Sequence, residues 1–291
     1  MAFVLGGGGA RGALQVGALR ALLEAGYQPD LLVGTSVGAI NSSFLALHGV
    51  TLKSIDDLVE TWHEASQADL LPPNYLWLTV RALFRRSDAY TSNRLRDFAV
   101  AHGVYPNLRF GDLQGVRLII VAADLNGGCV ALYGLDPSQS ILEGLLASTA
   151  LPPWVAPIDV DDRLLMDGGV VSNLPIEPAM TAGATEIIAL NLSDLGSYPQ
   201  EALGFGPFLA KLLHTMELRQ MELELALAQA RRIPLHYLHL RVPKPVPLWD
   251  FSHTDELIQH GYELARAEIP RWQAGRPSGI RAWLHRLTNK T

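Results

Sequence analysis

The sequence predicts an α/β protein, and three observations support this prediction. Residues 3–25 read as a short apolar strand, a glycine-rich loop and a helix. Residues 30–47 repeat the order of strand, tight turn and helix. The chain has 291 residues, 48% of them hydrophobic, which suits one large α/β domain or at most two smaller ones.

Composition excludes several classes of protein. The net charge of -6 argues against a nucleic-acid-binding surface, which would be basic. Cys129 is the only cysteine, so a disulfide within the chain and a thiolate metal cluster are both excluded. The chain has no signal-peptide pattern at its start and no apolar run near the roughly 18 residues that span a bilayer. We expect a cytoplasmic protein that uses no metal and no cofactor.

The first predicted unit is a strand at residues 3–5, a loop at 6–12 and a helix at 13–25. Backbone N–H groups of such a loop can surround an anion. The loop matches a dinucleotide fingerprint, but the next strand lacks the acidic residue that would bind a ribose. A phosphate-binding Walker loop would need a lysine where Ala13 stands. An oxyanion hole is the favoured interpretation, with nucleotide binding as the alternative.

The second unit contains a serine at a forced turn. Gly34 and Gly38 surround Ser36 between an apolar strand at 31–33 and a helix from residue 39. This strand, turn and helix order is typical of a nucleophile elbow, in which the serine hydroxyl projects near a helix start. Adjacent parallel strands would bring the elbow beside the glycine loop, as acyl transfer requires. The alternative is an ordinary turn that fits the pattern.

Residues 48–110 carry a weaker signal. We expect an amphipathic helix over 52–68. The aromatic and basic stretch 70–86 reads as a helix packed on the domain, or alternatively as a lid whose Trp77 and Phe84 meet lipid.

Two strands at 116–123 and 129–133, a helix at 140–148 and a short strand at 164–166 follow. We expect Cys129 to be a buried structural thiol in its apolar strand.

Asp167 is the candidate general base. It ends the strand at 164–166, and Gly168 and Gly169 let the chain turn away, which would leave the carboxylate exposed at the sheet edge. The alternative is an Asp-Gly turn capped by its own side chain. A conventional triad would also need a histidine. In an α/β-hydrolase the order along the chain is Ser, acid, His, and His236, His239 or His253 would satisfy it. That fold has several strands before its elbow, whereas only one predicted strand precedes Ser36, so a Ser-Asp dyad is favoured.

Four motifs occur together in the order found in patatin-like phospholipases, and the sequence resembles that family. The motifs are Gly7-Gly8-Gly9-Ala10-Arg11-Gly12, Gly34-Thr35-Ser36-Val37-Gly38, Ala147-Ser148-Thr149-Ala150-Leu151-Pro152 and Asp167-Gly168-Gly169. The resemblance implies a three-layer α/β/α sandwich with a mainly parallel sheet, and hydrolysis of acyl esters of lipids. It implies Ser36 as nucleophile and Asp167 as base. It also implies an oxyanion hole at Gly7, Gly8, Gly9 and Arg11, motif glycines at Gly12, Gly34, Gly38, Gly168 and Gly169, and an acyl pocket at Ser148, Pro152 and Trp154.

The remainder is less informative. We expect one patatin-like domain over 1–291, with core motifs in 3–195 and an extension over 196–291 that contains helices at 208–232 and 254–269. We expect the amphipathic tail at 279–290 to pack on the domain or on an oligomer partner, with a membrane-surface helix as the alternative. The predicted function is a serine esterase acting on lipid or other acyl esters, with peripheral membrane contact as an option. A thioesterase or acyltransferase with the same dyad is the alternative.

Overall fold

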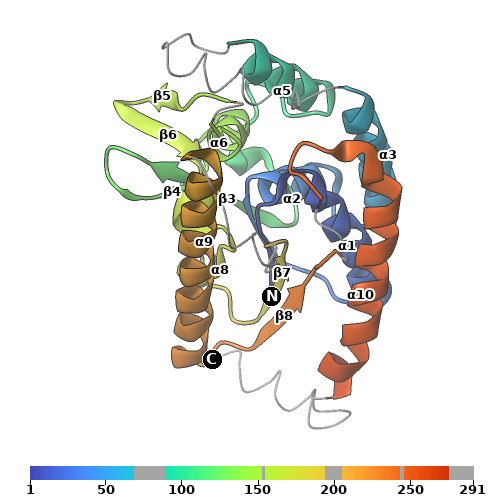
Figure 1. The fold of residues 1–291 in the computed structure, drawn as a ribbon. Helices are drawn as coiled ribbons and strands as arrows, with labels where there is room; N and C mark the ends of the chain where they lie inside the picture. The colour runs from blue at the N-terminus through green and yellow to red at the C-terminus, as the bar shows by residue number, and fades with distance from the viewer. Residues whose placement is uncertain (69–88, 153–154, 194–204, 243–245, 275–291) are drawn as a thin grey trace.

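A computed structural model describes residues 1–68, 89–152, 155–193, 205–242 and 246–274. Within these ranges eight strands form one sheet, and helices cover both of its faces (Figure 1). The predicted three-layer α/β/α class is therefore confirmed. The strands are β1 (Ala2–Leu5), β2 (Leu31–Thr35), β3 (Arg117–Asp124), β4 (Cys129–Tyr133), β5 (Ile158–Val160), β6 (Arg163–Asp167), β7 (Ile187–Asn191) and β8 (Leu235–His239).

The sheet combines a parallel centre with an antiparallel end. Strands β3, β2, β1, β7 and β8 are parallel neighbours in that order. Strands β4 and β6 both pair antiparallel with β3, and β5 pairs with β6. The order β2, β1 confirms that the glycine loop and the elbow leave adjacent parallel strands.

Two strands share one side of β3. Pairing with β2 extends to Val121, pairing with β6 begins at Ala122, and β4 pairs along the whole of Ile120–Asp124. A strand has only two hydrogen-bonding sides, and β4 occupies one of them at every one of these positions. Strands β2 and β6 therefore meet end to end along the other side, with the carboxyl ends of both strands facing each other.

Alternating residues of the buried strands feed two cores. Phe3 and Leu5 pack with one set of helices, while Ala2 and Val4 face the other set, and all four are fully buried. The first face is covered by α1 (Ala13–Glu24), α2 (Val37–His48), α3 (Leu52–Gln67), α6 (Ile141–Ser148) and α10 (Thr254–Ala274). The second carries α8 (Ile176–Thr181) and α9 (Phe205–Ala230), with the short α7 (Gly169–Ser172) against α9. Helix α5 (Ala89–Ala101) packs on α6. No helix in the described ranges is both long enough and apolar enough to cross a bilayer.

Most helices predicted from the sequence are present within a few residues of their expected ends. The expectation for Cys129 was wrong, because this residue begins β4 directly after an exposed turn and is itself exposed. The sequence analysis assigned neither β5, β7, α5 nor α8. The segments 70–86 and 279–290 lie outside the described residues.

Helix α10 lies in direct backbone contact with α1 (Figure 1). A Cβ atom added at Gly17 would collide with the carbonyl oxygen of Ile258, and one added at Gly261 would collide with that of Leu14. Glycine at both positions therefore lets the two helices approach each other more closely than side chains would allow. This contact ties the C-terminal extension to the first helix of the chain.

Candidate active site

Ser36 occupies a strained turn between β2 and α2. Its φ of 55° and ψ of -125° are unusual for a residue with a side chain. A Cβ atom at Gly34 would collide with the carbonyl oxygen of Gly38, and one at Gly38 would collide with that of Leu5. Both glycines are therefore needed for the tight bend, and Ser36 lies at the carboxyl end of β2 beside the N-terminus of α2.

Asp167 reaches Ser36 because β6 ends where β2 ends. Thr35 pairs with Val121, and the next residue of β3, Ala122, pairs with Asp167. The chain then turns at Gly168, where a Cβ atom would collide with the carbonyl oxygen of Val121. The structure thus brings together the two residues on which the sequence prediction depended, and both line one cavity.

The carboxyl group of Asp167 is buried, not exposed at the sheet edge as expected from sequence, with the residue only 3% exposed. Burial raises the pKa of Asp167 to about 6, while hydrogen bonding from the Ser36 side chain and from the Gly169 N–H lowers it in part. Oδ1 accepts the Gly169 N–H at 2.8 Å, and Oδ2 lacks an aligned donor among the described residues. A carboxylate in this state can accept a proton from the adjacent hydroxyl near neutral pH.

The three histidines considered for a triad have other partners. His236 bonds to Glu186 at 3.1 Å, and His239 Nε2 lies 2.8 Å from a backbone oxygen. His253 is half exposed, and its ring nitrogens lie 3.7 Å from an Asp250 oxygen and 3.4 Å from a Glu256 oxygen. None of these three belongs to the described lining of the cavity that contains Ser36 and Asp167. Within the described ranges, no group of three or more His, Cys, Asp or Glu side chains could hold a metal ion.

In the described part of the chain, two N–H groups of the glycine loop have no hydrogen-bond acceptor. The N–H of Gly7 donates to the carbonyl oxygen of Asn173 at 3.0 Å, and that of Ala10 donates to another backbone carbonyl at 2.8 Å. Gly8 and Gly9 have no such partner in the described part of the chain. Of the predicted oxyanion-hole glycines, Gly8 and Gly9 are therefore available to a negatively charged ligand atom, whereas Gly7 is engaged.

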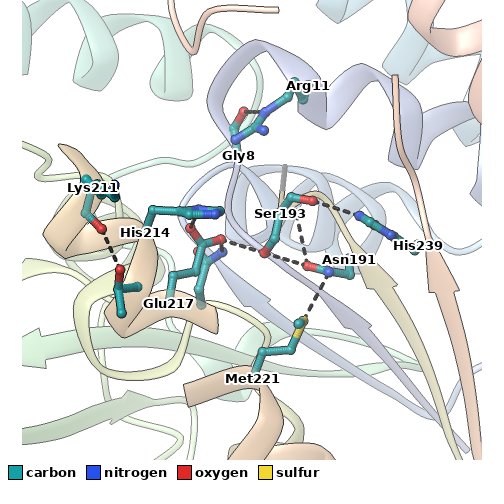
Figure 2. A network of polar contacts seen from close by, with 11 residues as sticks. Gly8, Arg11, Asn191, Ser193, Lys211, His214, Glu217, Met221 and His239 are labelled. Atoms are coloured by element: carbon teal, nitrogen blue, oxygen red, sulfur yellow. Dashed lines mark hydrogen bonds and ion pairs between the residues drawn. The ribbon is translucent and has the colours of Figure 1, made fainter. Parts of the chain in front are cut away.

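Arg11 orients this loop. Its Nε donates to the carbonyl oxygen of Gly8 at 3.2 Å, and its backbone N–H donates to the same oxygen (Figure 2). In a trans peptide the N–H points opposite to the carbonyl, so fixing the Gly8 carbonyl also fixes the direction of the Gly9 N–H. Gly9 borders the cavity. Arg11 thus contacts the back of the loop, and its guanidinium supports the predicted oxyanion site indirectly.

Two buried amide side chains, which the sequence analysis missed, brace both ends of the loop. Gln15 Nε2 donates to the carbonyl oxygen of Gly6 at 2.9 Å. Asn41 Nδ2 donates to the carbonyl oxygen of Gly12 at 3.1 Å and to Gln15 Oε1 at 3.0 Å, while its Oδ1 accepts the Trp62 indole N–H. The available signal was an amide close to the start of each of two predicted helices, among mainly small and apolar residues.

A second network attaches α9 to the strand ends beside the loop (Figure 2). Glu217 accepts hydrogen bonds from the Ser193 hydroxyl and the Asn173 side-chain amide. Ser193 also contacts Asn191 at the end of β7, and its carbonyl oxygen lies 2.8 Å from His239 Nε2. Because Asn173 also accepts the Gly7 N–H, this network holds the second face of the sheet against the glycine loop.

The cavity next to Ser36 has a volume of about 130 Å³ and a mostly apolar lining. Its walls come from α2, α3, α5, α6 and the segment before α10, and include Phe44, Leu58, Trp62, Phe98, Leu145 and Phe251. Ser148 and Pro152, predicted as acyl-pocket residues, are not among the described lining residues. Ser148 is fully buried behind the elbow, and Pro152 is exposed. Trp154 lies outside the described residues.

Comparisons with known proteins agree with this architecture. Residues 3–180 match the family described as Patatin-like phospholipase. The chain is 27% identical over 295 residues to human Patatin-like phospholipase domain-containing protein 6, covering 94% of this chain but only 20% of that protein. It is 32% identical over 194 residues to the uncharacterized protein YqhO of Bacillus subtilis, covering 60% of this chain and 64% of that one.

Among solved structures, VipD from Legionella pneumophila superposes with a TM-score of 0.52 at 15% identity, covering 91% of this chain and 66% of VipD. This likeness concerns the fold alone. The chain spans about a fifth of the human relative, so that longer protein contains much that has no counterpart here. The family match covers more than half of the sequence and includes the glycine loop, the elbow and Asp167. The chain belongs to the patatin-like phospholipase family.

Proposed function

We propose that this protein hydrolyses acyl esters of lipids through a Ser36–Asp167 dyad and an acyl-enzyme intermediate. The observation that carries the proposal is the meeting of Ser36, at a strained elbow, with a buried Asp167 at the wall of an apolar cavity. The names of the family and of the human relative support a lipid substrate.

In the proposed reaction, the Ser36 oxygen attacks the ester carbonyl while its proton passes to Asp167. The negative charge that develops on the carbonyl oxygen faces the N–H groups of Gly8 and Gly9, which have no other described partner. Collapse of the tetrahedral intermediate releases the alcohol, which takes the proton from Asp167. Water then attacks the acyl-enzyme by the same route, giving the free acid and restoring Ser36.

Cavity shape and chemistry support binding of the acyl chain rather than a polar group. Aromatic and aliphatic side chains from four helices line it, and burying a hydrocarbon chain against such walls is favourable by about 0.8 kcal/mol for each CH₂ group. Residues 70–86 lie outside the described residues, so the expectation of a helix packed on the domain, and the alternative of a lid that meets lipid, both stay predictions. We also propose one domain over 1–291, supported by the packing of α10 on α1.

The test measures the hydrolysis of p-nitrophenyl esters, from acetyl to palmitoyl, by wild type, Ser36→Ala and Asp167→Asn. We expect wild type to favour the longer chains, and each substitution to lower kcat by at least about 10³-fold. A fluorophosphonate should label wild type and leave Ser36→Ala unlabelled. His253→Ala is the control and should retain activity, because His253 is outside the described cavity lining.

Two outcomes would contradict this proposal. Equal losses for His253→Ala and Asp167→Asn would indicate a triad in place of the dyad. Hydrolysis by Ser36→Ala at the wild-type rate would exclude Ser36 as the nucleophile. Faster turnover of matched thioesters, or acyl transfer to added alcohols, would assign the same dyad to a thioesterase or acyltransferase.

A further inference from the structure

Ser148 holds the backbone of the elbow. This last residue of α6 is fully buried, and its hydroxyl oxygen accepts the backbone N–H of Ser36 at 2.9 Å. The same hydroxyl donates to the carbonyl oxygen of Val121 at 2.6 Å. A hydroxyl has one proton, so the bond to Val121 turns an oxygen lone pair toward Ser36.

The segment that follows α6 also holds the strand that carries Asp167. The backbone N–H of Asp167 donates to the carbonyl oxygen of Ala150 at 3.0 Å. Residues 148–150 therefore contact the backbone of both members of the proposed dyad, one of which follows β2 while the other ends β6. A segment placed in this way can set the position of the nucleophile relative to the base.

We propose that Ser148 is a positioning residue for the Ser36 nucleophile, an inference that rests on the proposed function. Ser36 has a φ of 55°, so its backbone stays in a costly conformation only while neighbouring contacts enforce it. The angle φ relates the direction of the Ser36 N–H to the direction of its Cα–Cβ bond. A contact that holds the N–H therefore helps to hold the direction in which the side chain projects. Removing the Ser148 hydroxyl leaves a partly buried N–H without its acceptor and releases one of these contacts.

A positioning role predicts different kinetics from the acyl-pocket role expected by resemblance. A pocket residue would change KM and the preference for chain length, because it would contact the bound substrate in the ground state. A residue that aims the nucleophile would change kcat, because misplacement by about 1 Å can cost 10²-fold in rate while binding is unaffected.

The experiment compares Ser148→Ala and Ser148→Thr with the matched control Ser42→Ala. Ser42 is a fully buried serine on α2 whose hydroxyl has no described hydrogen-bond partner, so its replacement removes the same atoms without breaking a bond. We expect Ser148→Ala to lower kcat by about 10- to 100-fold with KM within about twofold of wild type. Ser148→Thr should recover most of the rate, and Ser42→Ala should match wild type.

Hydrogen exchange of the Ser36 amide supplies a readout that does not depend on activity. We expect faster exchange in Ser148→Ala, with wild-type protection in Ser148→Thr and Ser42→Ala. If Ser148→Ala does not fold, Ser148→Cys replaces it, because a thiol is a weak acceptor, and it should show the same loss of kcat.

The proposal fails if the Ala or Cys variant has the kcat and Ser36 protection of the Ser42→Ala control, or if the change is in KM and chain-length preference. Failure of the proposed function is a separate result, since wild type would then show neither ester hydrolysis nor fluorophosphonate labelling. The exchange measurement would still test the bond between Ser148 and Ser36.

Discussion

At the scale of one residue, Asp167 shows how burial changes a carboxyl group proposed to act as a base, and what that burial costs. Its carboxyl group ends a strand inside the protein, where few donors compensate the loss of water. The charged form is therefore disfavoured, and the pKa rises to about 6. The same shift moves the basicity of the group toward that needed to accept a hydroxyl proton at neutral pH.

Activity should follow the ionisation of Asp167. Only the carboxylate can accept the Ser36 proton, so we expect kcat/KM to fall as the pH drops through about 6 and to level off above about 7. The measurement is the rate of hydrolysis of a neutral ester between about pH 5 and pH 8. A rate that stays constant from about pH 8 down to about pH 5, as an inflection near the ordinary value of 3.8 requires, would show that burial does not control the base.

Asp167→Asn should inactivate the protein and stabilise it. A rise in pKa from 3.8 to about 6 corresponds to a cost of about 3 kcal/mol for the ionised group. Above pH 6 both folded and unfolded chains carry the charge, and this cost is complete. Below 3.8 both are protonated, and it vanishes. We expect the variant to gain about 1–3 kcal/mol in free energy of unfolding at pH 8, and this gain to disappear near pH 4 in denaturant titrations.

A gain that is independent of pH would contradict this account, and so would a loss of stability at pH 8. The sequence predicted Ser36 as nucleophile and Asp167 as base, because both candidates lie in short local patterns. It did not identify Gln15, Asn41 or Ser148 as supports, since their partners are backbone carbonyls and amides distant in the chain. It also could not show that the Gly7 N–H already donates a hydrogen bond, because its acceptor, the carbonyl oxygen of Asn173, becomes a neighbour only after folding.

The elements owe their arrangement to pairings that periodicity does not encode. An apolar run predicts a strand, but nothing in 163–167 indicates that β6 runs antiparallel to β3 and meets β2. Helix α9 was predicted by its apolar face, and it is held in place by a buried acid. Glu224 accepts hydrogen bonds from the Ser172 hydroxyl and from the backbone N–H groups of Ile176 and Glu177.

Glu224→Ala should loosen α9 from the second face of the sheet. The substitution removes the acceptor for the Ser172 hydroxyl at the end of α7 and for two backbone N–H groups at the start of α8. Burial leaves these donors with little access to water, so we expect a loss of about 2–4 kcal/mol in free energy of unfolding. Burial raises the pKa of Glu224 to about 7, which agrees with its enclosed position. The control is Glu222→Ala on the exposed side of the same helix, where an ion pair with Arg219 contributes at most about 1 kcal/mol.

Equal losses for the two variants in urea titrations would show that these hydrogen bonds do not anchor α9.

The whole molecule is a sheet whose parallel centre presents loops at one edge and whose two helical layers enclose it (Figure 1). The class was predictable because strand, loop and helix alternate clearly in the first 47 residues. The contact of α10 with α1 was not, because it depends on Gly17 and Gly261, and glycines inside helices usually weaken them.

Gly261→Ala should destabilise the fold. In an exposed helix this change would stabilise by about 1 kcal/mol, but here the added methyl group collides with the carbonyl oxygen of Leu14. We expect the collision to reverse the sign and to cost about 1–3 kcal/mol. Thermal unfolding measures the effect, and Gln259→Ala at an exposed position of α10 is the control. A rise in Tm for Gly261→Ala would mean that the two helices separate without penalty.

The head-on junction of β2 and β6 has a consequence for how such a chain can diversify. Thr35 and Asp167 pair with Val121 and Ala122, consecutive residues of β3, so strand pairing brings Ser36 beside Asp167. The long excursions that connect these three strands do not enter this pairing, although residues 148–150 within them contact the backbone of both residues. Those excursions supply α3, α5 and α6, which form much of the wall of the cavity next to Ser36. Insertions or deletions in α3, α5 or the start of α6 can therefore reshape the cavity wall, while the proposed dyad and residues 148–150 keep their positions.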